Sequence, residues 1–196
     1  MRPVRRYVPR YAPGLGKMSV RQLRLFACGW CRLRWEMLDE QSKRAVEVAE
    51  RFADGLATAE QLKAARSDLK YHSPGDWKAG MAAGAASETI RTEIARGAAT
   101  WDTEAPSFEE DLHLILEITG GNCHRDVPPS VLKWNCDCVE KVATAIYHER
   151  AFDRMPVLAD ALEDAGCDNA HILKHCRHLG GHVRGCWVID LLLGKS

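Results

Sequence analysis

The spacing of apolar residues constrains this chain more than any other feature, because it follows the helical period along most of the length. From residue 19 to residue 38, apolar side chains recur at alternating steps of three and four, at Leu23, Phe26, Trp30, Leu33 and Met37. Such steps place side chains on one face of an α-helix. No useful stretch alternates apolar and polar residues, as a half-buried strand would. The sequence therefore predicts an all-α fold.

Capping and turn residues divide the chain into about eight or nine helices. Thr58 with Gln61, and Ser107 with Glu110, have the spacing of a capping box, and glycines follow several apolar runs. The expected helices span roughly residues 19–38, 45–52, 58–69, 76–96, 107–119, 131–149, 156–165, 170–179 and 183–193. Residues 1–18 contain prolines and no helical period, so we expect an extended basic arm before a helical domain of residues 19–196. A possible seam lies at residues 97–106.

Length and composition favour one compact body. The chain has 196 residues, of which 46% are hydrophobic and 28% charged. It contains no apolar run of about 18 residues, and its first residues lack the apolar core of a secretory signal. We therefore expect a cytoplasmic protein without a membrane partner. Under that expectation its eight cysteines are reduced thiols, some of them candidate metal ligands, rather than disulfides. The sequence does not indicate an oligomeric state.

A zero net charge conceals an uneven distribution of charged residues. Residues 1–35 contain nine basic residues and no acidic one, while the rest of the chain holds all 27 acidic and the other 18 basic residues. Such a segment can contact a polyanion, dock on its own acidic body or simply aid solubility. Tyrosines interleaved with the arginines could stack on bases. The candidate partner-binding residues, for an acidic protein surface or nucleic acid, are Arg2, Arg5, Arg6, Tyr7, Arg10, Tyr11, Arg21 and Arg24.

Two blocks of sequence resemble a known family. The strings RQLRLFACGWCRLRW and SKRAVEVAERFADG lie near the N-terminus, and HILKHCRHLGGHVRGCWVIDLLLGK lies near the C-terminus. Together, residues 20–56 and 145–195 resemble a planctomycete paralogous family of short helical proteins, some of them neighbours or fusions of repeat-companion modules. The resemblance implies a cytoplasmic, mostly helical chain. It transfers no catalytic residue.

Cysteines and histidines supply candidate ligands for a structural zinc. Cys28 and Cys31 are three residues apart on an expected helix, so their thiols share a face. The C-terminal block offers His175, Cys176, His182 and Cys186 as the other half of a site. The alternative is that these cysteines are buried as small apolar residues and that the histidines lie on a solvated helix surface.

The sequence contains none of the common catalytic motifs, such as a phosphate-binding glycine loop, G-x-S-x-G or H-E-x-x-H. We therefore interpret the chain as a binding or adaptor module of unknown specific function, with an acidic partner. The alternative is a metal-dependent or cysteine-based enzyme centred on Cys176, His182 and Cys186, in which His182 is better placed than His175 to activate a thiol.

Overall fold

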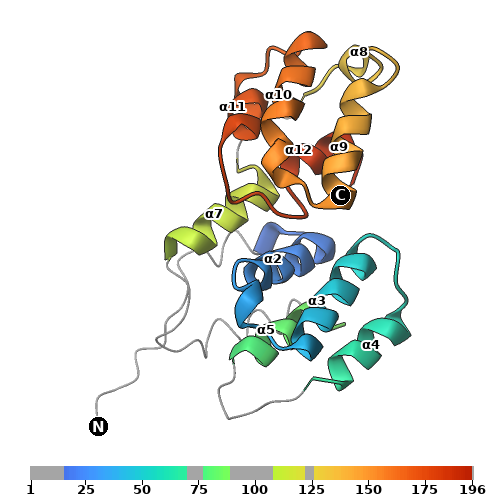
Figure 1. Cartoon of the computed structure of the whole chain (residues 1–196), viewed down its shortest axis with the longest axis vertical. Coiled ribbons are helices and arrows are strands. Elements are labelled where there is room, and N and C mark those ends of the chain that lie inside the picture. The colour runs from blue at the N-terminus through green and yellow to red at the C-terminus, as the bar shows by residue number, and fades with distance from the viewer. Residues whose placement is uncertain (1–15, 70–76, 89–107, 122–125, 196) are drawn as a thin grey trace. The chain divides into compact units, whose positions relative to one another are not determined.

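The computed structural model describes residues 16–69, 77–88, 108–121 and 126–195. Over these residues the chain forms α-helices, two short 3₁₀ helices and no strand, which confirms the prediction of an all-α fold (Figure 1). No helix within these ranges is both long and apolar enough to cross a membrane. Residues 1–15 of the expected arm and the expected seam at 97–106 lie outside the described residues.

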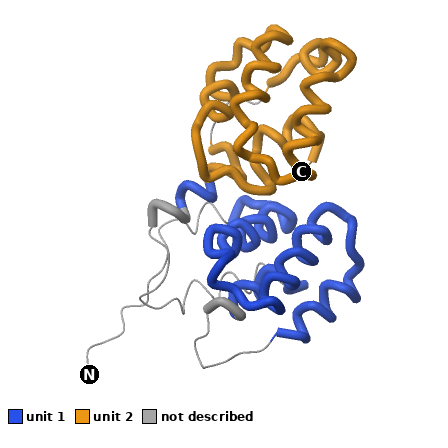
Figure 2. The backbone as a smooth tube through the Cα atoms, in the orientation of Figure 1, with its two compact units in different colours: residues 1–115 blue, residues 116–196 orange. Residues whose placement is uncertain are grey.

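The chain divides into two compact units, residues 1–115 and 116–196 (Figure 2). The division falls within helix α7, Phe108–Thr119, whose last turn belongs to the second unit.

The first unit is built from four helices and one 3₁₀ turn. They are α2 (Val20–Arg32), η1 (Trp35–Met37), α3 (Glu40–Ala53), α4 (Ala59–Ser67) and α5 (Trp77–Ala85). Helix α2 packs against α3 and α5, and α3 also packs against α4. The predicted capping box at Thr58 and Gln61 is present, and Ser19 with Gln22 forms another at the start of α2.

A buried arginine joins two helices of the first unit. The side chain of Arg24, on α2, is 2% exposed and donates hydrogen bonds to the carbonyl oxygens of Ala85 (2.5 Å) and Ser87 (2.9 Å). These carbonyls lie at the end of α5, where the helix leaves its last acceptors unpaired. A guanidinium suits this place because it carries several donors and a positive charge.

The second unit contains the end of α7 and five further helices. They are α8 (Pro129–Leu132), α9 (Cys138–Glu149), α10 (Met155–Asp164), α11 (Ala170–Arg177) and α12 (Trp187–Leu192), with a 3₁₀ turn, η2 (Phe152–Arg154), before α10. Helix α9 packs against α10 and α12, and α11 packs against the same two helices. Their shared core includes Ile146, Leu158, Ile172, Val188 and Ile189.

Two expected helices of this unit are shorter than the apolar pattern suggested. The prediction of one helix over 131–149 was wrong, because Asn135, Cys136 and Asp137 have φ values of 46°, 57° and 62°, in the left-handed region. Helix α9 begins only after this turn. The last helix begins at Trp187 rather than at residue 183, and α11 begins after Asn169, which caps it in place of the expected Asp168.

Candidate metal centre

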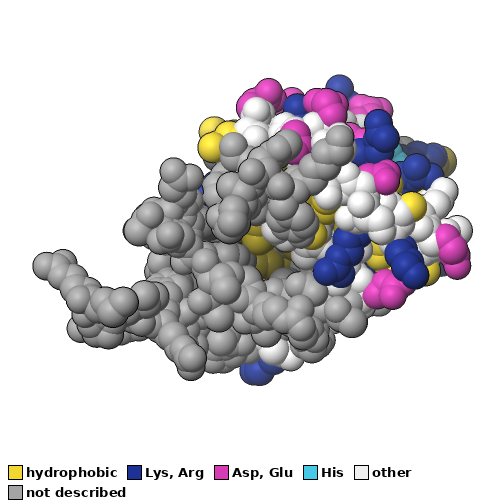
Figure 3. All heavy atoms as spheres, turned by 90° about the horizontal axis from the view of Figure 1, so that it is seen from below, with side chains coloured by type: hydrophobic (Ala, Val, Ile, Leu, Met, Phe, Trp, Pro, Cys, Tyr) yellow, Lys and Arg dark blue, Asp and Glu magenta, His cyan; other side chains and the backbone are white. Residues whose placement is uncertain are grey.

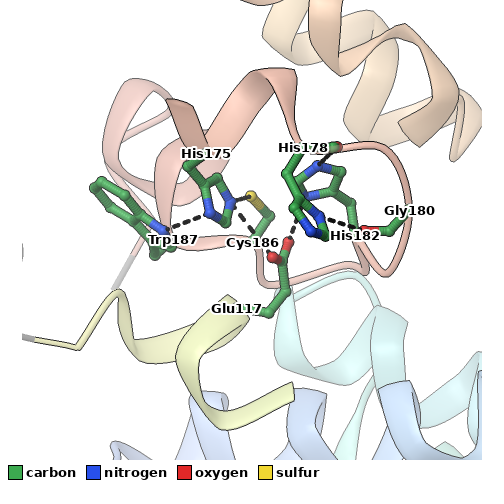
Figure 4. Close-up of polar contacts among 7 residues, drawn as sticks. All are labelled: Glu117, His175, His178, Gly180, His182, Cys186 and Trp187. Atoms are coloured by element: carbon green, nitrogen blue, oxygen red, sulfur yellow. Dashed lines mark hydrogen bonds and ion pairs between the residues drawn. The ribbon is translucent and has the colours of Figure 1, made fainter. Parts of the chain in front are cut away.

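Four side chains with metal-ligating groups converge in the second unit (Figure 4). Glu117 comes from α7, His175 from α11, His182 from the loop after α11, and Cys186 from the residue that precedes α12. One ligand atom from each lies within 4.8 Å of the others. We call these four residues the Glu-His-His-Cys cluster.

The end of α7 places Glu117 in the cluster. Leu114 and Ile118 are three positions before and one after Glu117, and all three are buried. The carboxylate therefore lies on the apolar face of the helix, where only 2% of the side chain is exposed. Gly120, with φ of 65°, ends the helix, and a Cβ there would lie 2.8 Å from Cδ2 of Trp187. The absence of a Cβ thus allows the end of α7 to approach Trp187.

A glycine-rich loop places His182 and Cys186. Gly180, Gly181 and Gly185 all have positive φ values, of 107°, 79° and 96°. Side chains other than glycine rarely adopt these conformations, so the turns depend on these residues. Between the turns, His182 folds back toward α11 and its Nε2 donates to the carbonyl oxygen of His178 at 3.0 Å.

Glu117 and His182 form a buried ion pair. Nδ1 of His182 lies 3.0 Å from Oε1 of Glu117, and the two side chains are 3% and 2% exposed. Both ring nitrogens of His182 face oxygen acceptors, the Glu117 carboxylate and the His178 carbonyl. Each nitrogen must carry a proton to make both bonds, so this imidazole is positively charged.

The pKa values of the pair shift in the directions that keep both groups charged. Burial alone would raise the pKa of Glu117, but the hydrogen bond from His182 and the charges of His175 and His182 outweigh it, so the pKa falls below its ordinary 4.5. Burial alone would lower the pKa of His182, but Glu117 outweighs it and the pKa rises above 6.5.

His175 lies between Trp187 and Cys186. The indole Nε1 of Trp187 donates to Nδ1 of His175 at 3.2 Å. On the other side of the ring, Nε2 is 3.2 Å from Sγ of Cys186 and 3.4 Å from Oε2 of Glu117. Because an indole nitrogen only donates, Nδ1 must be the acceptor, and the proton of a neutral His175 is on Nε2, facing the cluster.

The thiol of Cys186 is protonated in this environment. Burial raises its pKa well above 9.0, and the negative charge of Glu117 raises it further. A nucleophilic cysteine needs the opposite shift, toward a thiolate at neutral pH. The same holds for Cys176, whose pKa burial and Glu117 raise to about 12. These shifts disfavour a thiol nucleophile at either position.

The cluster has the donor atoms of a zinc site. Two ligands of a tetrahedral zinc are about 3.3–3.6 Å apart when their bonds are about 2.0–2.3 Å long. The separations of 3.0, 3.2 and 3.4 Å within the cluster are close to this, and the rest lie within 4.8 Å. The group could therefore hold a metal ion after the ligands close in by about 1 Å.

The structure brings three of the six sequence-derived ligand candidates together. His175, His182 and Cys186 belong to the cluster, whereas Cys176 is buried in the core of the second unit beside them. Cys28 and Cys31 lie on α2 of the first unit, where both are at most 1% exposed. Burial and the charge of Glu50 raise the pKa of both thiols, that of Cys31 to about 12.

Among the expected partner-binding residues, two lie in the described part of the chain. Arg21 pairs with Asp54 at 3.3 Å, and Arg24 is buried against the end of α5. The other six, Arg2, Arg5, Arg6, Tyr7, Arg10 and Tyr11, lie outside the described residues. On the face shown in Figure 3, the described basic and acidic side chains are interspersed rather than gathered by sign.

Sequence reasoning missed Glu117. The residue stands in the run Leu114, Ile115, Leu116, Glu117, Ile118, where the helical period places it on the same face as Leu114 and Ile118. A carboxylate on an apolar helix face is costly to bury without a partner. That conflict was the available signal that Glu117 meets a cation or a set of donors.

Comparisons with known proteins found no match among protein-family models, curated proteins or solved structures.

Proposed function

We propose that this chain is a binding module whose second unit, residues 116–196, binds one zinc ion through Glu117, His175, His182 and Cys186. The observation that carries the proposal is the convergence of these four ligand groups, from α7, α11, the following loop and the start of α12, within 4.8 Å. The ion would join the end of α7 to the C-terminal segment of the unit.

Charge balance supports a divalent ion at this place. In the protonated cluster, the carboxylate of Glu117 is neutralised by the imidazolium of His182. When a divalent ion binds, His182 and Cys186 each lose one proton, and the two anionic ligands, Glu117 and Cys186, neutralise the ion. Neither state leaves an unpaired charge in a buried site, where such a charge would be costly.

The outer contacts of His182 also fit a metal ligand. Its Nδ1 faces the cluster, and its Nε2 donates to the carbonyl oxygen of His178. Histidines that bind metals commonly donate their second nitrogen to a carbonyl or carboxylate, which fixes the orientation of the ring. Coordination through Nδ1 would leave this outer hydrogen bond intact.

The number of ligands supports a structural rather than a catalytic role. Catalytic zinc sites keep one position for water or substrate, whereas structural sites use four protein ligands. The cluster supplies four and is mostly buried. A bound zinc would stabilise the second unit, because the unfolded chain lacks the assembled site.

Native mass spectrometry with zinc titration tests the proposal. Wild-type protein should bind one zinc per chain, and Cys186→Ser or His182→Ala should abolish this. His171→Ala is a matched control, because His171 is an exposed histidine on α11 outside the cluster. Circular dichroism of each variant separates loss of a ligand from loss of fold. A zinc that persists in both cluster variants, or is absent from folded wild type, would overturn the proposal.

The partner that we propose for such a module is an acidic protein surface or nucleic acid, contacted by the basic N-terminal segment. Its support is compositional, since residues 1–35 hold nine basic residues and no acidic one. If the partner is nucleic acid, binding should weaken steeply with salt and be lost when Arg2, Arg5, Arg6 and Arg10 are changed to glutamine. Salt-insensitive binding would exclude nucleic acid as the partner.

A further inference from the structure

The proton positions around His175 differ between the metal-free cluster and a zinc-bound one. In the structure, the indole of Trp187 donates to Nδ1 of His175, so the ring proton is on Nε2. Nε2 is the nitrogen that faces Glu117 and Cys186. Zinc needs the lone pair of Nε2, so coordination moves the ring proton to Nδ1. Two N–H groups, those of Trp187 and His175, would then face each other.

We propose that Trp187 opposes zinc coordination by His175 and thereby makes the zinc at this site exchangeable. This inference rests on the zinc site proposed above. Binding removes the acceptor of a buried indole, and an unsatisfied buried donor carries a large penalty. The hydrogen bond from Trp187 and the bond from zinc therefore compete for the two nitrogens of one imidazole, and this antagonism is reciprocal.

The surroundings of Trp187 prevent an easy escape from this competition. Trp187 is 4% exposed, and its ring is so close to Gly120 that a Cβ there would lie 2.8–3.2 Å from three ring atoms. The ring of His175 lies 5.2 Å from the Trp187 ring and 4.9 Å from that of His182. The indole is thus packed between the end of α7 and His175 (Figure 4). A donor held in this way retains its aim when the acceptor is lost.

Trp187→Phe tests the inference because it removes the indole N–H and keeps an aromatic ring. Zinc affinity, measured by competition with a fluorescent chelator at fixed pH under reducing conditions, should increase on the order of 10-fold. Loss of packing would weaken binding, so a gain in affinity separates the two effects. Trp134→Phe, in the same unit, is the control and should leave the affinity unchanged. His175→Ala should abolish the difference between tryptophan and phenylalanine at position 187.

A second readout uses wild-type protein. The indole N–H proton resonance of Trp187 should shift upfield when zinc is added, as its hydrogen bond to His175 is lost. Wild-type protein that binds zinc with no such shift, and a Trp187→Phe variant of equal or lower affinity, would overturn this inference and leave the zinc site standing. Folded wild type that binds no zinc would overturn both.

Discussion

Replacement of Gly120 by alanine tests the packing that positions the cluster. Gly120 has φ of 65°, and its Cβ would lie 2.8 and 2.9 Å from Cδ2 and Cγ of Trp187. The left-handed conformation costs an alanine roughly 1–2 kcal/mol. Overlap with the buried Trp187 ring adds about 1–3 kcal/mol, because the ring or the end of α7 must shift. Gly120→Ala should therefore lower the free energy of unfolding by about 2–5 kcal/mol.

Gly166→Ala supplies the matched control. Gly166 lies in the same unit with φ of 84°, but its added Cβ would have no neighbour within 4 Å. This variant should cost only the conformational part, roughly 1–2 kcal/mol. Urea denaturation followed by circular dichroism compares the two, provided that the slope with denaturant is unchanged. Equal losses of stability in both variants would refute the placement of Trp187 against the end of α7.

Further predictions concern the cluster and the first unit. With a chelator present, the stability difference between wild type and Glu117→Gln should be largest between about pH 4.5 and 6.5. It should shrink below this window as the lowered pKa of Glu117 is reached, and above it as the raised pKa of His182 is passed; a pH-independent difference would contradict the ion pair. Among the described cysteines, iodoacetamide should modify the exposed Cys136 first, and Cys186, which is buried and protonated, far more slowly. Peptide mass spectrometry would show this order, and fast modification of Cys186 would instead favour a thiol enzyme. Arg24→Met should lower the free energy of unfolding by about 2 kcal/mol or more, because it leaves the carbonyls of Ala85 and Ser87 without the guanidinium; a urea midpoint equal to that of wild type would contradict this.

The fold class and most helices could be predicted because they depend on local features of the sequence. Apolar spacing and capping residues act over a few positions, as at Thr58 and Gln61, where the expected capping box forms. The break before α9 could not be predicted in this way. Asn135, Cys136 and Asp137 carry side chains, so nothing in their types marked a left-handed turn.

The candidate site was only partly predictable, because its geometry depends on a turn rather than on a helix. Extending the last helix back to residue 183 separated Cys186 from α11 and made His182 its expected partner. In the structure, residues 183–186 precede the helix, and the thiol of Cys186 lies beside His175 instead. Cysteine and histidine types could be recognised as ligands, but the partner Glu117, 58 positions before His175, required tertiary packing to be found.

X-ray absorption spectroscopy at the zinc edge of protein loaded with one equivalent of zinc tests the central claim most directly. Our account predicts one sulfur at about 2.3 Å and three nitrogen or oxygen ligands at about 2.0–2.2 Å, with the sulfur lost in Cys186→Ser. A shell without sulfur, or one with two or more sulfurs, would contradict the assignment of Glu117, His175, His182 and Cys186 as the zinc ligands.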